Sequence, residues 1–170
     1  MATAPVSVTT IKLAPMSDGC CLRIEGRGTM HESPCAEAIA SRTLEADQTS
    51  RVVFDLSACD YLDSTFLGCL IHLFRDFGKG TPPRFQVAAP PAKRKKLLGA
   101  CNLESMIPSI DTAPDSGNHW VTVPPSPLGT KEMTKHVWEC HKLLAEVDSP
   151  MRPAFAKIAE QLERELTAMR

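Results

Sequence analysis

The sequence contains no apolar run of the roughly 18 residues that a membrane-spanning helix requires. Its first residues, MATAPVSVTTIKL, lack the basic start and apolar segment of a secretory signal, so we expect a cytoplasmic protein. The charges are nearly balanced, with 19 Lys and Arg against 20 Asp and Glu, which excludes the strong positive potential of a non-specific nucleic-acid binder. We therefore expect neither a membrane span nor a nucleic-acid partner.

Familiar catalytic motifs are also missing. The chain has no Gly-rich phosphate loop, no H-E-x-x-H, no G-x-S-x-G and no G-x-G-x-x-G. Its seven cysteines form an odd set without a C-x-x-C pair, which favours reduced thiols packed as small apolar side chains. We expect no disulfide, no cofactor and no catalytic residue, and hence a protein that is not an enzyme.

What the sequence does contain is enough apolar material for a packed core, with 43% hydrophobic and 23% charged residues over a length of 170. Its β-prone segments alternate with helical ones, which is typical of an α/β fold. We expect strands at 6–13, 20–25, 51–56, 84–90 and 106–110. We expect helices from Ser33-Pro34 to about 47, from 63–65 to Gly78, and over 90–101.

The amino-acid composition changes after residue 111. Four prolines and two glycines within 112–130 indicate a connector that crosses the domain surface. Apolar positions then recur at helical spacing in two stretches separated by a Pro-bearing break, which predicts a helical hairpin. The expected organisation is a mixed β-sheet domain with helices packed on it over 1–111, a Pro-rich connector over 112–130 and an α-helical hairpin over 131–170.

Each hairpin helix carries an apolar stripe that must be covered by another surface. The stripe can fold on its own domain or on a second copy of the chain, and we slightly favour the second copy. The sequence therefore allows a homodimer through residues 131–170.

Two groups of polar residues suggest chemistry but have simpler interpretations. His136 and Cys140 lie four residues apart with His141 adjoining, yet a metal site needs three or four converging ligands, so we favour packing and expect no metal site. Asp60 and Asp63 could form an acid/base pair, but the turn before a helix favours local capping by such residues.

The segment RVVFDLSACDYLDSTFLGCLIHLFRDF carries the strongest signal. It resembles the signature of STAS domains, the fold of bacterial anti-sigma factor antagonists. In that family a buried strand ending in D-L-S leads through a short aromatic or aliphatic pair to D-S-S-G-L-G and an apolar helix. This chain has D-L-S at 55–57 and D-S-T-F-L-G at 63–68, and the resemblance extends more weakly over residues 6–111.

The resemblance implies a phosphorylation switch. Ser64 would be the modified hydroxyl, with Thr65 as the alternative, and Asp60, Asp63, Ser64, Thr65 and Phe66 would form the partner-binding surface. The partners would be an anti-sigma factor that is also a serine kinase, which binds the unphosphorylated chain, and a phosphatase. The alternative is a STAS adaptor or assembly subunit that is not phosphorylated and dimerises through its C-terminal helices.

Phe66 is one departure from the family pattern, which has glycine there. A ring turned into the core would leave the surface unchanged, whereas an exposed ring would create an apolar docking patch.

Overall fold

The structure is a computed structural model that describes residues 9–117 and 119–170. The strand expected at 6–13 therefore lies partly outside the described residues, at 6–8. The described strands are β1 (Thr10–Met16), β2 (Gly19–Gly28), β3 (Arg51–Asp55), β4 (Cys59–Leu62), β5 (Phe85–Ala88), β6 (Ser109–Ile110) and β7 (Val121–Thr122). The described helices are α1 (Ser33–Ala46), α2 (Ser64–Phe77), α3 (Pro91–Leu98), the short 3-10 helix η1 (Gly99–Cys101), α4 (Thr130–Ala145) and α5 (Arg152–Ala168).

The strands form one mixed sheet in the order β6-β5-β3-β2-β1-β7, and β4 pairs with β2 beside this path. β1 is antiparallel to both β2 and β7, while β2, β3, β5 and β6 run parallel to one another. The expected mixed sheet is confirmed. β4 and β7 were not predicted: β4 lies in the turn before α2, and β7 lies in the Pro-rich segment that was interpreted as a connector.

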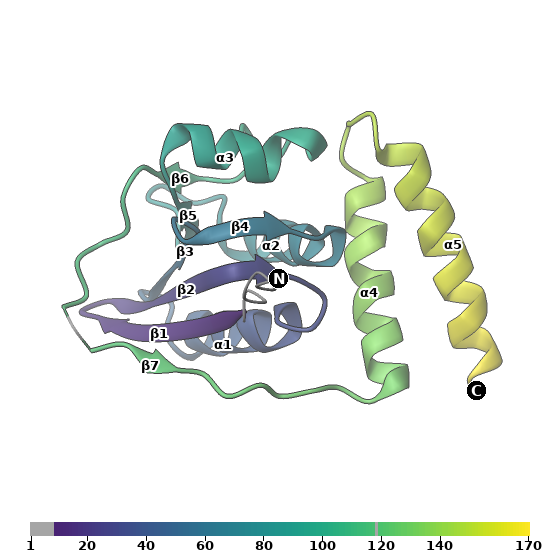
Figure 1. The fold of residues 1–170 in the computed structure, drawn as a ribbon, viewed down its shortest axis with the longest axis horizontal. Helices are drawn as coiled ribbons and strands as arrows, with labels where there is room; N and C mark the ends of the chain where they lie inside the picture. Colours follow the sequence, from purple (N-terminus) through teal and green to yellow (C-terminus); the bar gives the residue numbers. More distant parts are fainter. Residues whose placement is uncertain (1–8, 118) are drawn as a thin grey trace, which may run out of the picture.

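Helices α1 and α2 lie together behind the sheet and enclose the main core (Figure 1). Val52 and Phe54 of β3 point into this core, whereas Val53 joins a smaller cluster on the opposite face with Cys21 and Ala88. Trp120 of the connector packs against that second cluster. The expectation that β3 is buried on both faces is confirmed.

One predicted helix cap is wrong. Glu32 occupies the N-cap position of α1 without a capping hydrogen bond from its side chain, and Ser33 is already the first helical residue. Ser33 is fully buried, and its hydroxyl lies 2.8 Å from His136 Nε2 of α4. The Ser33 hydroxyl therefore bonds a side chain of α4 that is 103 residues away in the sequence.

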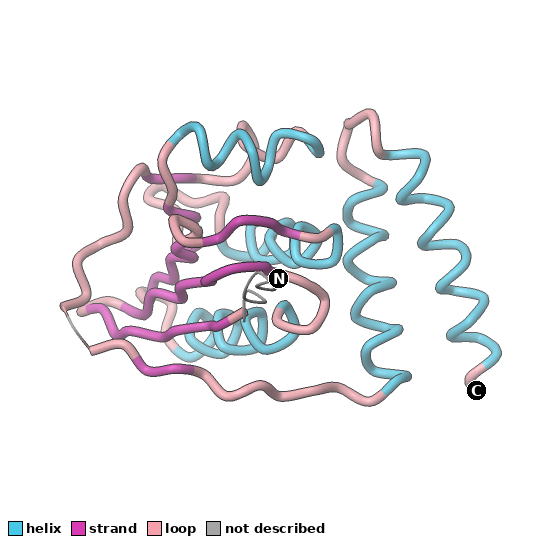
Figure 2. Tube along the Cα trace, in the orientation of Figure 1, coloured by secondary structure: helices cyan, strands magenta, loops and turns pink. Residues whose placement is uncertain are grey.

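The two C-terminal helices form the predicted hairpin. Figure 2 shows them as neighbouring antiparallel helices at one end of the sheet domain, with α4 on the inner side and α5 on the outer side. α4 packs against α2, so its apolar stripe is covered by the chain's own domain and by α5. The structure thus shows the intramolecular alternative rather than the favoured second copy, and a homodimer through 131–170 stays a prediction.

Candidate functional site

The candidate site lies where β4 ends and α2 begins. Asp63 caps the helix: its Oδ1 accepts a hydrogen bond from the Phe66 backbone N–H at 2.8 Å, and its Oδ2 accepts one from the Met30 N–H at 2.7 Å. Both carboxylate oxygens are therefore used to fix the first turn of α2 and the loop before α1. The capping interpretation of Asp63 is confirmed, and Ser64 is held rigidly at the first helical position.

The D-L-S segment has a comparable structural role at the end of β3. Asp55 is 2% exposed, and its Oδ1 accepts hydrogen bonds from the backbone N–H and the hydroxyl of Ser57. Its other oxygen accepts from Arg23 Nε at 3.0 Å, which pairs the buried carboxylate with a cation. The first half of the signature thus closes the turn that leads to β4 and the site.

The five residues expected to bind a partner differ in accessibility. The Asp60 side chain is exposed, 3.9 Å from Lys93 Nζ, and Asp63 and Ser64 are partly buried. Thr65 is 3% exposed and Phe66 is fully buried, with its ring edge-on to that of Phe54. A partner-contact role for Phe66 and Thr65 does not fit this placement. The ring at 66 enters the core, so the departure from the family glycine leaves the surface unchanged.

Ser64 is covered by the C-terminal hairpin. Its Oγ lies 2.9 Å from Nε2 of His141 in α4, a side chain that is only 4% exposed. The other ring nitrogen, Nδ1, donates to the backbone carbonyl of Val137 at 2.7 Å, since a carbonyl oxygen can only accept. In the tautomer with its proton on Nδ1, Nε2 accepts a hydrogen bond from the Ser64 hydroxyl.

A Ser–His hydrogen bond of this kind also occurs where histidine activates a serine nucleophile. Here the pair lies beneath α4, and the ring of Phe155 from α5 covers His141 edge-on with the ring centres 5.8 Å apart. The hairpin therefore covers the side of Ser64 that faces His141, while Ser64 as a whole is partly buried. The Ser64 hydroxyl is therefore hydrogen-bonded by His141 and covered on that side by the hairpin.

Gly68 allows the two helices to approach so closely. A Cβ atom placed on Gly68 would lie 2.5 Å from both the Cβ and the carbonyl oxygen of Cys140, far inside van der Waals contact. Glycine is therefore required at this position for α4 to lie on α2 as observed. The same glycine ends the D-S-T-F-L-G segment, so the signature also prepares the surface on which α4 packs.

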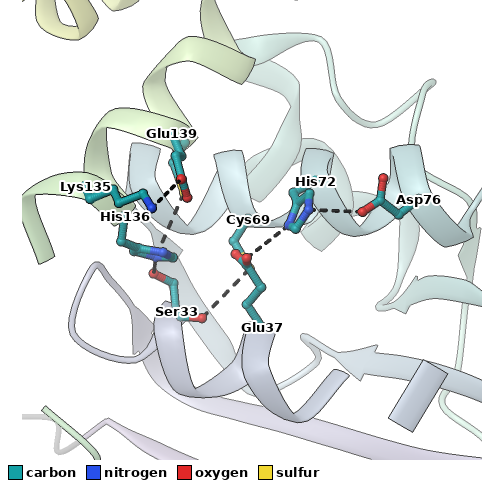
Figure 3. Close-up of polar contacts among 9 residues, drawn as sticks. Ser33, Glu37, Cys69, His72, Asp76, Lys135, His136 and Glu139 are labelled. Carbon is teal, nitrogen blue, oxygen red and sulfur yellow. Dashed lines mark hydrogen bonds and ion pairs between the residues drawn. The ribbon is translucent and has the colours of Figure 1, made fainter. Parts of the chain in front are cut away.

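A second polar cluster joins α1, α2 and α4 (Figure 3). Glu37 of α1 bonds His72 of α2 at 3.0 Å, and His72 also lies 3.1 Å from Asp76. The hydrogen bond to Glu37 raises the pKa of His72 despite its partial burial. Burial alone would raise the pKa of Glu37. The hydrogen bond from His72 and the charges of His72 and His136 outweigh burial, so the pKa of Glu37 is lowered.

The pKa values of two neighbouring thiols are raised, which favours their protonated form in the absence of a cation. Burial raises the pKa of the Cys140 thiol strongly, and the carboxylates of Glu37, Glu139 and Asp63 raise it further. Burial likewise raises the pKa of Cys69. By contrast, burial lowers the pKa of His136, which favours its neutral ring. Sequence reasoning interpreted His136, Cys140 and His141 as packing, because their partners Glu37, Ser33 and Ser64 lie far away along the chain.

The mixed sheet, its two covering helices and the capped serine at the start of α2 together make a STAS fold, the fold of anti-sigma factor antagonists. An anti-sigma factor antagonist from Mycobacterium paratuberculosis, known from a crystal structure, is similar with a TM-score of 0.51 and 23% sequence identity over 65% of this chain and 92% of that one. The anti-sigma factor antagonist SpoIIAA in its unphosphorylated form gives a TM-score of 0.48 and 15% identity over 61% of this chain and 89% of its own.

Sequence comparison is less informative than structure. No protein-family profile and no curated protein sequence matches this chain. The fold predicted from the D-L-S and D-S-T-F-L-G segments is nevertheless the one that the structure and the similar solved chain from Mycobacterium paratuberculosis show. Among the described helices, none is both long and apolar enough to span a bilayer.

Proposed function

We propose that the chain is a partner-switching regulator, an anti-sigma factor antagonist controlled by phosphorylation of Ser64, with Thr65 as the alternative site. The unphosphorylated form binds an anti-sigma factor that is also a serine kinase, and a phosphatase resets the switch. The observation that carries this proposal is the placement of Ser64 at the first position of α2 in a STAS fold, capped by Asp63. In this proposal the chain is a regulator, and no catalytic residue is assigned.

The start of α2 suits a phosphate for an electrostatic reason. The first backbone N–H groups of a helix lack intrahelical acceptors and lie at the positive end of the helix dipole. A phosphate on Ser64 would add about −1.5 to −2 charges beside Asp63 and near the exposed Asp60. A partner that buries this surface would then meet a dianion next to two carboxylates, which costs several kcal/mol without a matching cation. Phosphorylation would therefore release the partner.

The hairpin adds a condition to this switch. Because Ser64 Oγ lies 2.9 Å from the buried ring of His141, a phosphate on this oxygen would replace the hydrogen bond to α4. In our proposal, kinase and partner approach the start of α2 from the side that α4 covers. The described conformation is accordingly the closed form in our proposal, and Ser64 becomes available when α4 moves away.

The first experiment is mass spectrometry of the protein isolated from its own host. The tryptic peptide from Val52 to Arg75 contains Ser57, Ser64 and Thr65, and fragmentation distinguishes the three hydroxyls. We expect phosphate on Ser64, and phosphate on Thr65 would retain the switch but move its site by one residue. An unmodified peptide under all growth and stress conditions would contradict the proposal.

Partner binding tests the charge argument. Ser64→Ala should bind the host's anti-sigma factor as tightly as the unmodified chain, whereas Ser64→Asp should bind at least about tenfold more weakly. Ser105→Asp is the matched control, because Ser105 is an exposed serine after α3. Equal affinities of the Ala and Asp variants would exclude a charge-driven switch at Ser64.

Gly68→Ala tests the role of the hairpin without altering Ser64. The added methyl would overlap Cys140, so α4 should be displaced, and we expect faster phosphorylation of Ser64 and tighter partner binding. Gly99→Ala is the control, because the nearest atoms to an added methyl there lie at an ordinary 3.7 Å. Unchanged phosphorylation in the Gly68 variant would show that α4 does not limit access.

The covered position of Ser64 favours a second function, that of a STAS adaptor or assembly subunit without phosphorylation. Such a subunit was expected to dimerise through its C-terminal helices, although α4 packs on its own domain here. Light scattering distinguishes the two: a dimer that becomes a monomer when residues 128–170 are removed supports the adaptor. A monomeric full-length chain excludes the homodimer.

A further inference from the structure

Three metal-binding side chains converge between α1 and α4. They are Glu37 of α1 and His136 and Cys140 of α4, and one potential ligand atom from each lies within 4.8 Å of the other two. Cys140 Sγ is 3.9 Å from His136 Nε2. Bonds of about 2.0 Å to nitrogen and 2.3 Å to sulfur in a tetrahedral zinc site separate two such ligands by about 3.5 Å. The observed spacing is thus close to that of a formed site.

We propose that Glu37, His136 and Cys140 bind a divalent transition-metal ion, of which Zn²⁺ fits best. Thiolate, imidazole and carboxylate are the three ligand types of protein zinc sites, and the combination of sulfur with nitrogen disfavours Mg²⁺ and Ca²⁺. His136 and Cys140 are four residues apart on one helix, so they present their ligand atoms on one face. Glu37 completes the set from a helix that is distant in the sequence.

The surroundings favour a cation. The three residues line a cavity of about 330 Å³, which leaves room for a water molecule as a fourth ligand. Glu139 and Glu146 line the same cavity with Glu37, together with Lys142 and with His72, whose pKa is raised. The three carboxylates outnumber these two basic groups, which favours a cation in the cavity.

The neighbouring residues can orient the ligands. His72 bonds Glu37 Oε1 at 3.0 Å and thereby orients this carboxylate (Figure 3). Ser33 Oγ lies 2.8 Å from His136 Nε2, and binding through this nitrogen would exchange that hydrogen bond for a metal bond. Residues that hydrogen-bond metal ligands set the orientation of those ligands and contribute to the affinity for zinc.

A metal ion at this position would connect the hairpin to the sheet domain, since its ligands come from α4 and from α1. It would therefore hold α4 in place over Ser64, because Cys140 directly precedes His141, whose Nε2 lies 2.9 Å from Ser64 Oγ. This consequence rests on the proposed function, whereas metal binding itself does not. The zinc-bound chain would be the closed form of the switch.

Cobalt(II) is the first probe, because a cysteine thiolate bound to Co²⁺ gives a charge-transfer band in the near ultraviolet. We expect the full-length protein to bind one Co²⁺ per chain with this band, and Zn²⁺ to displace it. Cys140→Ser should abolish the band, and His136→Gln and Glu37→Gln should each weaken Zn²⁺ binding by at least about 100-fold. Cys35→Ser, a partly buried cysteine also on α1 but outside the cluster, should bind as the unchanged protein does.

Circular dichroism of each metal-free variant shows whether the fold is intact, and Glu37→Gln leaves α4 untouched if a change at Cys140 disturbs it. Absence of a thiolate band in the unchanged protein, or its persistence in Cys140→Ser, would overturn the proposal. Hydrogen exchange measures the consequence: Zn²⁺ should slow the amides of α4 by at least about tenfold in the unchanged protein and in Cys35→Ser, but not in the variants of Glu37, His136 and Cys140. Since neither readout involves Ser64, failure of metal binding leaves the phosphorylation proposal standing, and an unphosphorylated Ser64 leaves the metal site standing.

Discussion

The sheet domain and the C-terminal hairpin are stabilised in different ways. In the sheet domain, β3 is buried on both faces and α2 buries eight of its fourteen residues. In the hairpin, α5 buries only Phe155 and Ala159 of its seventeen residues, and α4 buries only Cys140, His141 and Leu144 of its sixteen. The sheet domain therefore carries most of the core, and the hairpin is attached to it through one face of one helix.

This difference indicates which part of the molecule can move. Elements with few buried apolar contacts open locally at a lower free-energy cost than global unfolding. The hairpin meets this condition, and it covers Ser64 directly. A switch built on this fold can therefore expose its serine by moving two helices while the sheet and α2 remain folded.

The largest expected effect is in the sheet domain. Phe54→Ala removes a fully buried ring that packs edge-on against Phe66 and Phe85, and we expect a loss of about 3–5 kcal/mol in the free energy of global unfolding. Denaturant unfolding followed by circular dichroism measures this loss. A loss below about 1 kcal/mol would contradict the assignment of Phe54 to the centre of the core.

Phe155→Ala should separate the two regions. Its ring is 5% exposed and covers His141, so its loss should weaken hairpin docking by up to about 3 kcal/mol. Hydrogen exchange should become faster in α4 and α5 while the amides of β2 and β3 keep their protection. Ile158→Ala, at an exposed position on α5, is the control. Equal acceleration in the sheet would show that hairpin and sheet open as one unit.

Asp63→Ala should lower the free energy of unfolding by about 1–2 kcal/mol, an intermediate effect that thermal unfolding measures. The change removes the cap of α2 and the hydrogen bond to the Met30 N–H. Asp60→Ala serves as the comparison, because the Asp60 carboxylate is mostly exposed and should change stability by less than about 0.5 kcal/mol. Similar losses in both variants would argue against a specific capping role.

The smallest effect is expected at the edge of the interface between α2 and α4. Arg75→Gln removes an exposed ion pair with Glu146, and such pairs contribute less than about 1 kcal/mol. The loss should shrink as salt is added, because screening already weakens an exposed pair. Native-state hydrogen exchange of α4 at low and high salt measures this loss of stability. A loss of stability that does not depend on salt would indicate a packing role for Arg75 instead.

Local patterns predicted much of the site. The placement of Asp63 before an apolar helical stripe was sufficient to predict the start of α2, because a cap acts within three residues of its own position. The apolar segment of β3 predicted a central strand for a similar reason. The cap expected at Ser33 was wrong because a residue of α4 took its hydroxyl, and no local pattern records that competition.

By itself, the sequence determined the mixed α/β fold, the first turn of α2 with its serine and the presence of two amphipathic helices at the C-terminus, since each depends on neighbouring residues. The tertiary structure decided what the hairpin covers. An apolar stripe on a helix indicates only that some surface must cover it. Here α2 covers it, because Gly68 lets Cys140 of α4 approach closely. Contacts such as Ser64 with His141, and the convergence of Glu37 with His136 and Cys140, join residues that are 77 and about 100 positions apart. Only the folded chain brings them together.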